Sequence, residues 1–290
     1  MAATGVLAVF AGGCGSGVDG EALQQAGDDA GGKSTEVDAG DRASMPNIYV
    51  DQTIETLDGA GGGNPARESY LAARDLCVEA GIAVQPLAES DVEKLGTSRL
   101  QRWITPDSAA YRNEEWGAGT AGSSTQEQMC QFVLVSTGVH LYVDSDRMVT
   151  LDLGTNEMHE QKPKATLLQR GPSLSMEDAK ASQVAKASAS AVSTPVEAVE
   201  AGQPCLQWQS LDDMGSFCVW SGGTEWGFSV KPGRLLDSHS DDLLGRIVLK
   251  QEPGRSNPTR VTTREFTLGG KFDDDAMLPV VASGSLDKPQ

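Results

Sequence analysis

Two long tracts of the chain are poor in the side chains that build a hydrophobic core, and they limit where folding can occur. The first runs from Gly15 to Ser44 and consists mainly of Gly, Asp, Ala and Ser; the second, at about 163–202, is rich in Ala and Ser and has no aromatic residue. The first tract buries too little apolar surface to offset the conformational entropy lost on folding. We therefore expect a disordered spacer at 14–45, two folded domains at 46–162 and 203–282, an Ala/Ser-rich linker at 163–202 with a short helix at 176–189, and a tail at 283–290.

The first domain is expected to combine one helix with several strands. Apolar residues gather on one face of residues 66–80 and Gly81 follows them, so this stretch predicts a helix that ends there. Apolar or alternating runs predict strands at 47–57, 82–87 and 99–104. Residues 131–153 predict an antiparallel meander of three short strands, with turns at 136–138 and 144–146.

The second domain is expected to consist almost wholly of strands. Apolar–polar alternation predicts them at 204–209, 217–230, 245–252 and 259–270, and Ser221-Gly222-Gly223 predicts a tight hairpin within the second run. The two segments together predict an α+β fold of two small domains rich in antiparallel β-hairpins. Each segment has a cysteine before a Ser-x-Gly turn and an aromatic strand, which duplication or convergence would explain equally well.

The cysteines constrain both the covalent structure and the compartment. There are five of them, an odd number, and only Cys14 lies outside the two predicted domains. The remaining four fall two in each domain, which favours pairing Cys77 with Cys130 and Cys205 with Cys218 over the two other connectivities. Such disulfides persist in oxidising compartments outside the cytosol. No pair has the C-x-x-C spacing of redox or zinc motifs; scattered free thiols in a cytosolic protein are the alternative.

The N-terminal residues carry a resemblance to a known class of exported proteins. A short apolar run, 5–11, leads into small residues and a cysteine, Ala11-Gly12-Gly13-Cys14. This stretch resembles the lipobox of bacterial lipoproteins, in which Leu is usual where this chain has Ala11. The resemblance implies a signal peptide at 1–13, a diacylglycerol anchor on Cys14 and a location in the cell envelope. By the same resemblance, Gly15 in place of Asp after the cysteine permits sorting to the outer membrane, where we expect the protein to face the periplasm.

The same residues allow a competing interpretation as a dinucleotide-binding loop. Gly15, Gly17 and Gly20 have the G-x-G-x-x-G spacing, and Asp38 lies about where the ribose-binding acid is expected. Such a loop needs a second buried strand, however, and residues 28–46 contain no apolar run that could form one. A cytosolic nucleotide-binding protein is therefore the disfavoured alternative.

Charge excludes several partners. The formal net charge is −18 and the pI is near 4.5, which argues against binding nucleic acid and against a polybasic contact with lipid headgroups. No cofactor motif is present. Acidic residues gather at 273–275 and in a second cluster that we treat as a weak metal candidate: Asp237, His239, Asp241 and Asp242. The EF-hand pattern is absent, so solvated loops are the simpler interpretation of both.

No sequence motif identifies an enzyme. G-x-S-x-G and H-E-x-x-H are missing, and His140 and His159 occupy strand positions where a surface imidazole is expected. Trp220, Trp226 and Phe228 would form a contact surface if they flanked an exposed hairpin, or would fill a core. The sequence therefore favours a binding or assembly component of the envelope, whose partner is a protein or a glycan. The alternative is an envelope hydrolase of polysaccharide or peptide that uses carboxylates.

Overall fold

The computed structural model describes residues 45–58, 62–163, 194–209, 213, 215–231 and 245–281. Several features expected from the sequence lie outside these ranges, namely the lipobox-like motif with Cys14, the spacer, the linker helix and the cluster of Asp237, His239, Asp241 and Asp242. Among the described helices, none has the length and apolar character required to cross a membrane.

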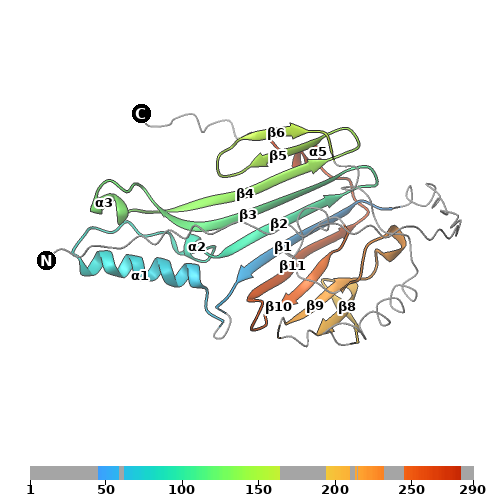
Figure 1. Ribbon diagram of the computed structural model, residues 1–290, viewed down its shortest axis with the longest axis horizontal. Helices are drawn as coiled ribbons and strands as arrows, with labels where there is room; N and C mark the ends of the chain where they lie inside the picture. The colour runs from blue at the N-terminus through green and yellow to red at the C-terminus, as the bar shows by residue number, and fades with distance from the viewer. Residues whose placement is uncertain are drawn as a thin grey trace, which may run out of the picture. The chain divides into compact units, whose positions relative to one another are not determined.

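The described part of the chain is an all-β structure built on one sheet of eleven strands (Figure 1). All neighbouring strands are antiparallel, in the order β6-β5-β4-β3-β2-β1-β11-β10-β9-β8-β7. The first six are β1 Ile48–Thr56, β2 Thr97–Ile104, β3 Ala109–Thr120, β4 Phe132–Val143, β5 Met148–Asp152 and β6 Met158–Gln161. The others are β7 Val196–Glu200, β8 Gln203–Gln209, β9 Ser216–Trp220, β10 Val248–Glu252 and β11 Thr259–Leu268.

The expectation of two α+β domains is wrong, because the two segments share one sheet. Strand β1 pairs with β2 along one edge and with β11, from the end of the chain, along the other. The two segments also share a hydrophobic core, in which Ile48 and Val50 of β1 lie in one buried cluster with Trp220 and Leu249. Apolar–polar alternation within a segment predicts that a strand forms there, but it does not show which other strand will pair with it. The sequence pattern alone therefore could not show whether the two segments form separate domains or one sheet.

Helix α1, Pro65–Glu79, agrees with the prediction for 66–80. The Asn64 side chain accepts hydrogen bonds from the backbone N–H groups of Ala66 and Arg67, which caps the first turn, and Gly81 adopts a φ of 70° where the chain leaves the helix. The apolar face of α1 packs Tyr70 against Phe132 at the start of β4. The strand predicted at 82–87 is absent, and this segment contributes a single bridge through Gln85.

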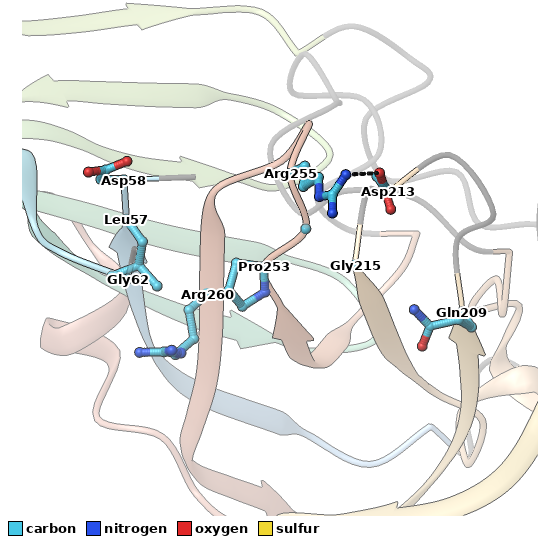
Figure 2. Close-up of a pocket in the computed structure, with 10 residues that line it drawn as sticks. Leu57, Asp58, Gly62, Gln209, Asp213, Gly215, Pro253, Arg255 and Arg260 are labelled. Atoms are coloured by element: carbon cyan, nitrogen blue, oxygen red, sulfur yellow. Dashed lines mark ion pairs between the residues drawn. The ribbon is translucent and has the colours of Figure 1, made fainter. Parts of the chain in front are cut away.

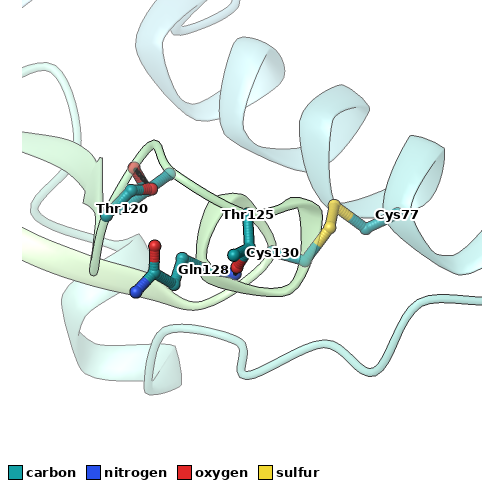
Figure 3. The surroundings of a disulfide bond; sticks show 6 residues. Cys77, Thr120, Thr125, Gln128 and Cys130 are labelled. Carbon is teal, nitrogen blue, oxygen red and sulfur yellow. Dashed lines mark hydrogen bonds between the residues drawn. A yellow bond between two sulfur atoms is a disulfide. The ribbon is translucent and has the colours of Figure 1, made fainter.

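Both predicted disulfides are present. Cys77 of α1 is bonded to Cys130, two residues before the start of β4 (Figure 3), and Cys205 of β8 is bonded to Cys218 of the adjacent β9. The short helix α3, Gln126–Met129, brings Cys130 into place, and Thr125 accepts a hydrogen bond from the backbone N–H of Gln128 at its start. The two disulfides indicate an oxidising, extracytoplasmic compartment.

The aromatic residues near 220 do not form the predicted hairpin. After β9 the chain turns into a short 3₁₀ helix, Thr224–Trp226, instead of a second strand. Trp220 and Phe228 are buried, Trp226 is half-buried, and the rings of Trp220 and Phe228 have centroids 5.2 Å apart. These residues therefore fill the core and do not present the contact surface that the hairpin would have carried.

The predicted turn at 136–138 also proves to be wrong, because β4 continues through it. Gly138 has a φ of 135°, and a Cβ at this position would collide with the backbone carbonyl oxygen of Asn113 in β3. The glycine thus permits a close approach of two paired strands and does not mark a chain reversal. The turn at 144–146 is correct, since Asp144 accepts hydrogen bonds from Asp146 and Arg147 between β4 and β5.

Replacement of Gly138 by alanine tests this close approach. Gly138→Ala is expected to lower the free energy of unfolding by about 2 kcal/mol or more, because the new Cβ meets backbone in a conformation that L-residues disfavour. Gly117→Ala in β3, where nothing lies within 4 Å of the added Cβ, is the matched control and is expected to change stability by about 0.5 kcal/mol or less. Equal effects of the two substitutions in urea unfolding would contradict this description of β4.

Candidate functional site

One face of the first half of the sheet carries a row of polar residues. Asp51, Gln101, Arg112 and His140 are successive cross-strand neighbours on β1, β2, β3 and β4. Residues that are directly opposite each other lie on the same face of a sheet. The residues next to them in sequence, such as Val50 and Leu141, are buried and point to the opposite face. The polar row therefore lies on the face opposite the shared core.

A hollow of about 430 Å³ opens over this row, and we call it the His140 hollow. Its polar lining comes from the three neighbouring strands β2, β3 and β4 and from the turn after β5, and it includes Gln101, Arg112, Glu114, Ser136, His140 and Asn156. Its apolar lining comes from Trp103, Leu151 and Leu153, from Ala276 of helix α5, Asp274–Met277, and from Leu278 and Val280 that follow this helix. The C-terminal segment is held there by Met277, which is buried against Trp103 and Ala110.

His140 is the most unusual residue of the hollow, because it is a buried imidazole. Its exposed fraction is only 5%, and burial lowers its pKa to about 4, with the nearby positive charge of Arg112 adding to the effect. A hydrogen bond with the backbone of Met277 acts in the opposite direction. Nε2 is buried and has no hydrogen-bond partner among the described residues, so the bond to Met277 is assigned to Nδ1–H. At neutral pH the ring is therefore uncharged and offers Nε2 as an acceptor.

Arg112, Glu114 and Ser136 form a hydrogen-bonded group beside His140. Arg112 donates from Nη2 to Glu114 Oε2 over 2.9 Å, and the Ser136 hydroxyl donates to Glu114 Oε1 over 2.7 Å. Arg112 Nε is buried and, among the described residues, has no acceptor. Arg112 and His140 are directly paired across β3 and β4. Arg112 and His140, which both line the hollow, thus each carry a buried polar atom that has no partner among the described residues.

The arrangement is suited to binding more than to nucleophilic catalysis. Within the described residues no hydrogen bond joins Ser136 to His140, whose Nε2 is without a partner. Glu114, which accepts the hydrogen bond of the Ser136 hydroxyl, is already engaged in an ion pair with Arg112. An activated serine would need an adjacent free base within hydrogen-bond reach.

A larger hollow, of about 930 Å³, lies at another part of the structure and has a different character (Figure 2). Its Arg255–Asp213 ion pair is 3.8 Å long, with side chains 86% and 67% exposed, and such surface pairs contribute little. Arg260, also in the lining, is already bonded to Glu55 over 3.2 Å. Because none of its lining side chains is a buried polar group without a partner, we assign the candidate site to the smaller hollow.

The predicted site residues have mixed outcomes. His140 was expected at the surface and is buried, because the C-terminal segment covers it; His159 is exposed on β6. Of the acidic run at 273–275, Asp275 lines the hollow, and no metal-binding group of three or more ligands occurs in the described part of the chain. Sequence reasoning missed Arg112, Glu114 and Ser136, although the alternation of charge at 112 and 114 on a strand was a signal that could have been used.

Comparisons with protein-family models, with curated proteins and with solved structures found no match. The function of the His140 hollow is therefore argued from its own chemistry.

The buried state of His140 predicts a specific pH dependence of stability. Its pKa is about 4 in the folded protein and about 6.5 when unfolded, so the unfolded chain binds more protons between these values and stability falls as the pH drops from about 6.5 to 4. Relative to His140→Gln, the wild type is expected to lose about 2 to 3 kcal/mol of unfolding free energy between pH 7 and 4.5. The exposed control, His159→Gln, should retain the wild-type profile in urea unfolding; identical profiles for His140→Gln and wild type would show that His140 is not buried as described.

Proposed function

We propose that this protein is a lipid-anchored binding protein of the bacterial cell envelope that holds a small, uncharged polar group in the His140 hollow. The observation that carries the binding role is His140, which lines an open hollow and whose buried Nε2 is without a partner in the described structure. Leaving a buried polar atom unpaired costs about 1 to 3 kcal/mol. A ligand that supplies the missing hydrogen bond removes this cost.

The chemistry of the hollow specifies the group that it would bind. His140 Nε2 requires an N–H or O–H donor, and Arg112 Nε requires an acceptor oxygen. The positive charge of Arg112 is already balanced by Glu114, so an anionic ligand would meet the Glu114 carboxylate without a free cation to match it. A primary amide or a vicinal diol presents a donor and an acceptor side by side without charge. The ligand is therefore a carboxamide or a sugar-like hydroxyl pair.

The location in the envelope rests on two independent features. The disulfides fit an oxidising compartment. The lipobox-like Ala11-Gly12-Gly13-Cys14 would supply a lipid anchor, and the expected flexible spacer after it would separate the folded domain from the bilayer. We therefore propose that Cys14 attaches the protein to the outer membrane and that the folded domain faces the periplasm. This arrangement accounts for both the disulfides and the lipobox-like motif. The rival role as an envelope hydrolase has weaker support, because Ser136 lacks a free base.

Mass spectrometry of the protein from a bacterial membrane fraction tests the anchor. The mature chain is expected to begin at Cys14 and to carry added acyl mass, while four thiols become reactive only after reduction. Cys14→Ser is the control and should yield an unacylated chain in the soluble fraction. A full-length, unacylated wild-type chain would contradict the anchor.

Isothermal titration with two probes tests the hollow. The probes are N-acetylglutamine amide, which carries a carboxamide, and N-acetylglucosamine, which carries hydroxyl pairs. At least one is expected to bind in the millimolar range or tighter, and His140→Ala should weaken its Kd about tenfold, equivalent to about 1.4 kcal/mol. The exposed His159→Ala is the matched control and should bind as wild type does. If neither probe binds, or if His140→Ala binds as well as wild type, the hollow is not the binding site.

A further inference from the structure

Two atoms of the His140 hollow are buried although their side chains line it. His140 Nε2 and Arg112 Nε have no partner among the described residues, and neither atom is exposed to solvent. A ligand in the hollow therefore cannot bond to either atom while every element around the hollow keeps its place. The proposed function thus requires that some part of the lining can move.

The lining of the hollow has a fixed part and a separate part. The fixed part comes from β2, β3, β4 and β5 and from the turn after β5, and these strands are hydrogen-bonded to one another in the sheet. The separate part is the C-terminal segment, residues 271–281, which follows β11 and contains no strand of the sheet. This segment can therefore move without breaking the sheet. It contributes Asp275, Ala276, Leu278 and Val280 to the lining.

The residues just before this segment hold its start in place and can act as a hinge. The backbone N–H of Gly269 donates to the Asn47 carbonyl over 2.9 Å, and the Asn47 side chain donates to the Gly270 carbonyl over 2.8 Å. Gly269 has a φ of 73°, and nothing lies within 4 Å of a Cβ placed there. Two successive glycines can absorb a large change of backbone dihedral angles. The segment can therefore turn about residues 269–270 while β11 stays paired.

Beyond this hinge the segment has few polar attachments. Within the described residues, a single hydrogen bond joins residues 271–281 to the sheet, between the Met277 backbone and His140. The other hydrogen bonds of the segment, from the N–H groups of Asp275 and Ala276 to Asp273, are internal to it. Lifting the segment therefore breaks one hydrogen bond to the sheet.

The side chain of Met277 attaches the segment to the sheet by apolar contact. Its exposed fraction is 4%, and it lies in a buried cluster with Trp103 and Ala110. The Trp103 ring in turn has its centroid 6.1 Å from that of His140, so Met277 covers the surroundings of the imidazole. With so few buried side chains, the segment can open locally at a smaller cost than unfolding of the sheet. Its exposed residues are Lys271, Asp273, Asp275, Ala276, Val280 and Val281.

We propose that residues 271–281 are a lid over the His140 hollow, which turns about Gly269 and Gly270, lifts Met277 from Trp103 and gives a ligand access to His140 Nε2. The proposal deepens the proposed function and rests on it, because it concerns the same hollow and the same atom. A ligand that binds only the open lid has an apparent Kd equal to its intrinsic Kd divided by the open fraction. The lid thereby regulates affinity through its own stability.

Modification by diethyl pyrocarbonate tests the lid without any ligand. The lone pair of a neutral imidazole nitrogen attacks a carbonyl carbon of the reagent, so that the ring is ethoxycarbonylated and ethyl carbonate leaves. His140 offers Nε2 only when the lid is open, whereas His159 is exposed on β6 and serves as the internal reference. At neutral pH, peptide mass spectrometry is expected to show His140 reacting about ten to a thousand times more slowly than His159, as a minor open state requires.

Two variants test whether Met277 controls access to His140. Met277→Ala removes the side chain from the buried cluster and is expected to speed modification of His140 about tenfold or more. Val281→Ala is the matched control, because Val281 belongs to the same segment, is 41% exposed and does not line the hollow. It should change the rate by less than about twofold. Equal rates in wild type and Met277→Ala would overturn the lid.

Urea distinguishes opening of the lid from unfolding of the whole sheet. Local opening exposes little surface, so the rate of His140 modification is expected to stay nearly constant at urea concentrations well below the unfolding transition. A rate that rises with the same slope as global unfolding would show that the sheet itself covers Nε2 and would overturn the lid. Because this measurement uses the wild-type chain, it decides the question even if Met277→Ala does not fold.

Isothermal titration of the same variants connects the lid to binding. The probe is whichever of N-acetylglutamine amide and N-acetylglucosamine binds the wild-type protein. Met277→Ala is expected to tighten the Kd by the same factor by which it speeds modification, until most molecules are open. Faster modification with an unchanged Kd would show that the ligand does not enter through the lid and would overturn the proposal.

Two further outcomes separate the lid from the proposed function. If Met277→Ala speeds modification but no probe binds either protein, the lid is supported and the proposed ligand fails. If His140 of the wild type reacts as fast as His159, Nε2 is already open to solutes; the lid is then overturned, whereas binding in the hollow still stands on its own titration.

Discussion

The pairing of β1 with β11 is the constraint on which the rest of the structure depends. It joins residues from the start and the end of the described chain, from Ile48 opposite Leu268 to Thr56 opposite Thr259. Buried Gln52 reinforces the junction, since its Nε2 donates to Thr263 of β11 over 2.9 Å and to the Val248 carbonyl of β10 over 2.6 Å. Without this pairing, two sheets would each expose an open edge and half of a core.

The same junction creates the candidate site. Because β11 lies beside β1, the segment after it crosses the polar face of the sheet and sets Met277 over His140. Burial by this segment makes the imidazole neutral, and its hydrogen bond with Met277 leaves Nε2 free to accept. The polar row would otherwise lie open to solvent. The segment covers part of it and so helps to form the hollow. The site is thus a product of the long-range topology and not of a local motif.

The sequence predicted some of the local features and none of the long-range strand pairing. Helix α1 had a recognisable end at Gly81, and the division of the cysteines between the segments identified both disulfides. Strand β3 was missed because its residues do not alternate between apolar and polar, and it is its pairing with β4 over the whole strand that identifies it. Burial of His140 could not be foreseen, because it depends on Met277, a residue far along the chain. Gly138 resembled a turn residue because a close approach of strands and a chain reversal both demand glycine.

The most direct test of this account is nitrogen NMR of the His140 ring in protein labelled with ¹⁵N-histidine, with His140→Gln used to assign its signals. The account predicts a neutral ring from pH 7 to pH 5, protonated on Nδ1, whose Nε2 signal shifts when N-acetylglutamine amide is added. A ring that titrates near its ordinary pKa of about 6.5, or one that carries its proton on Nε2, would contradict the account, because the hollow would then lack its free acceptor.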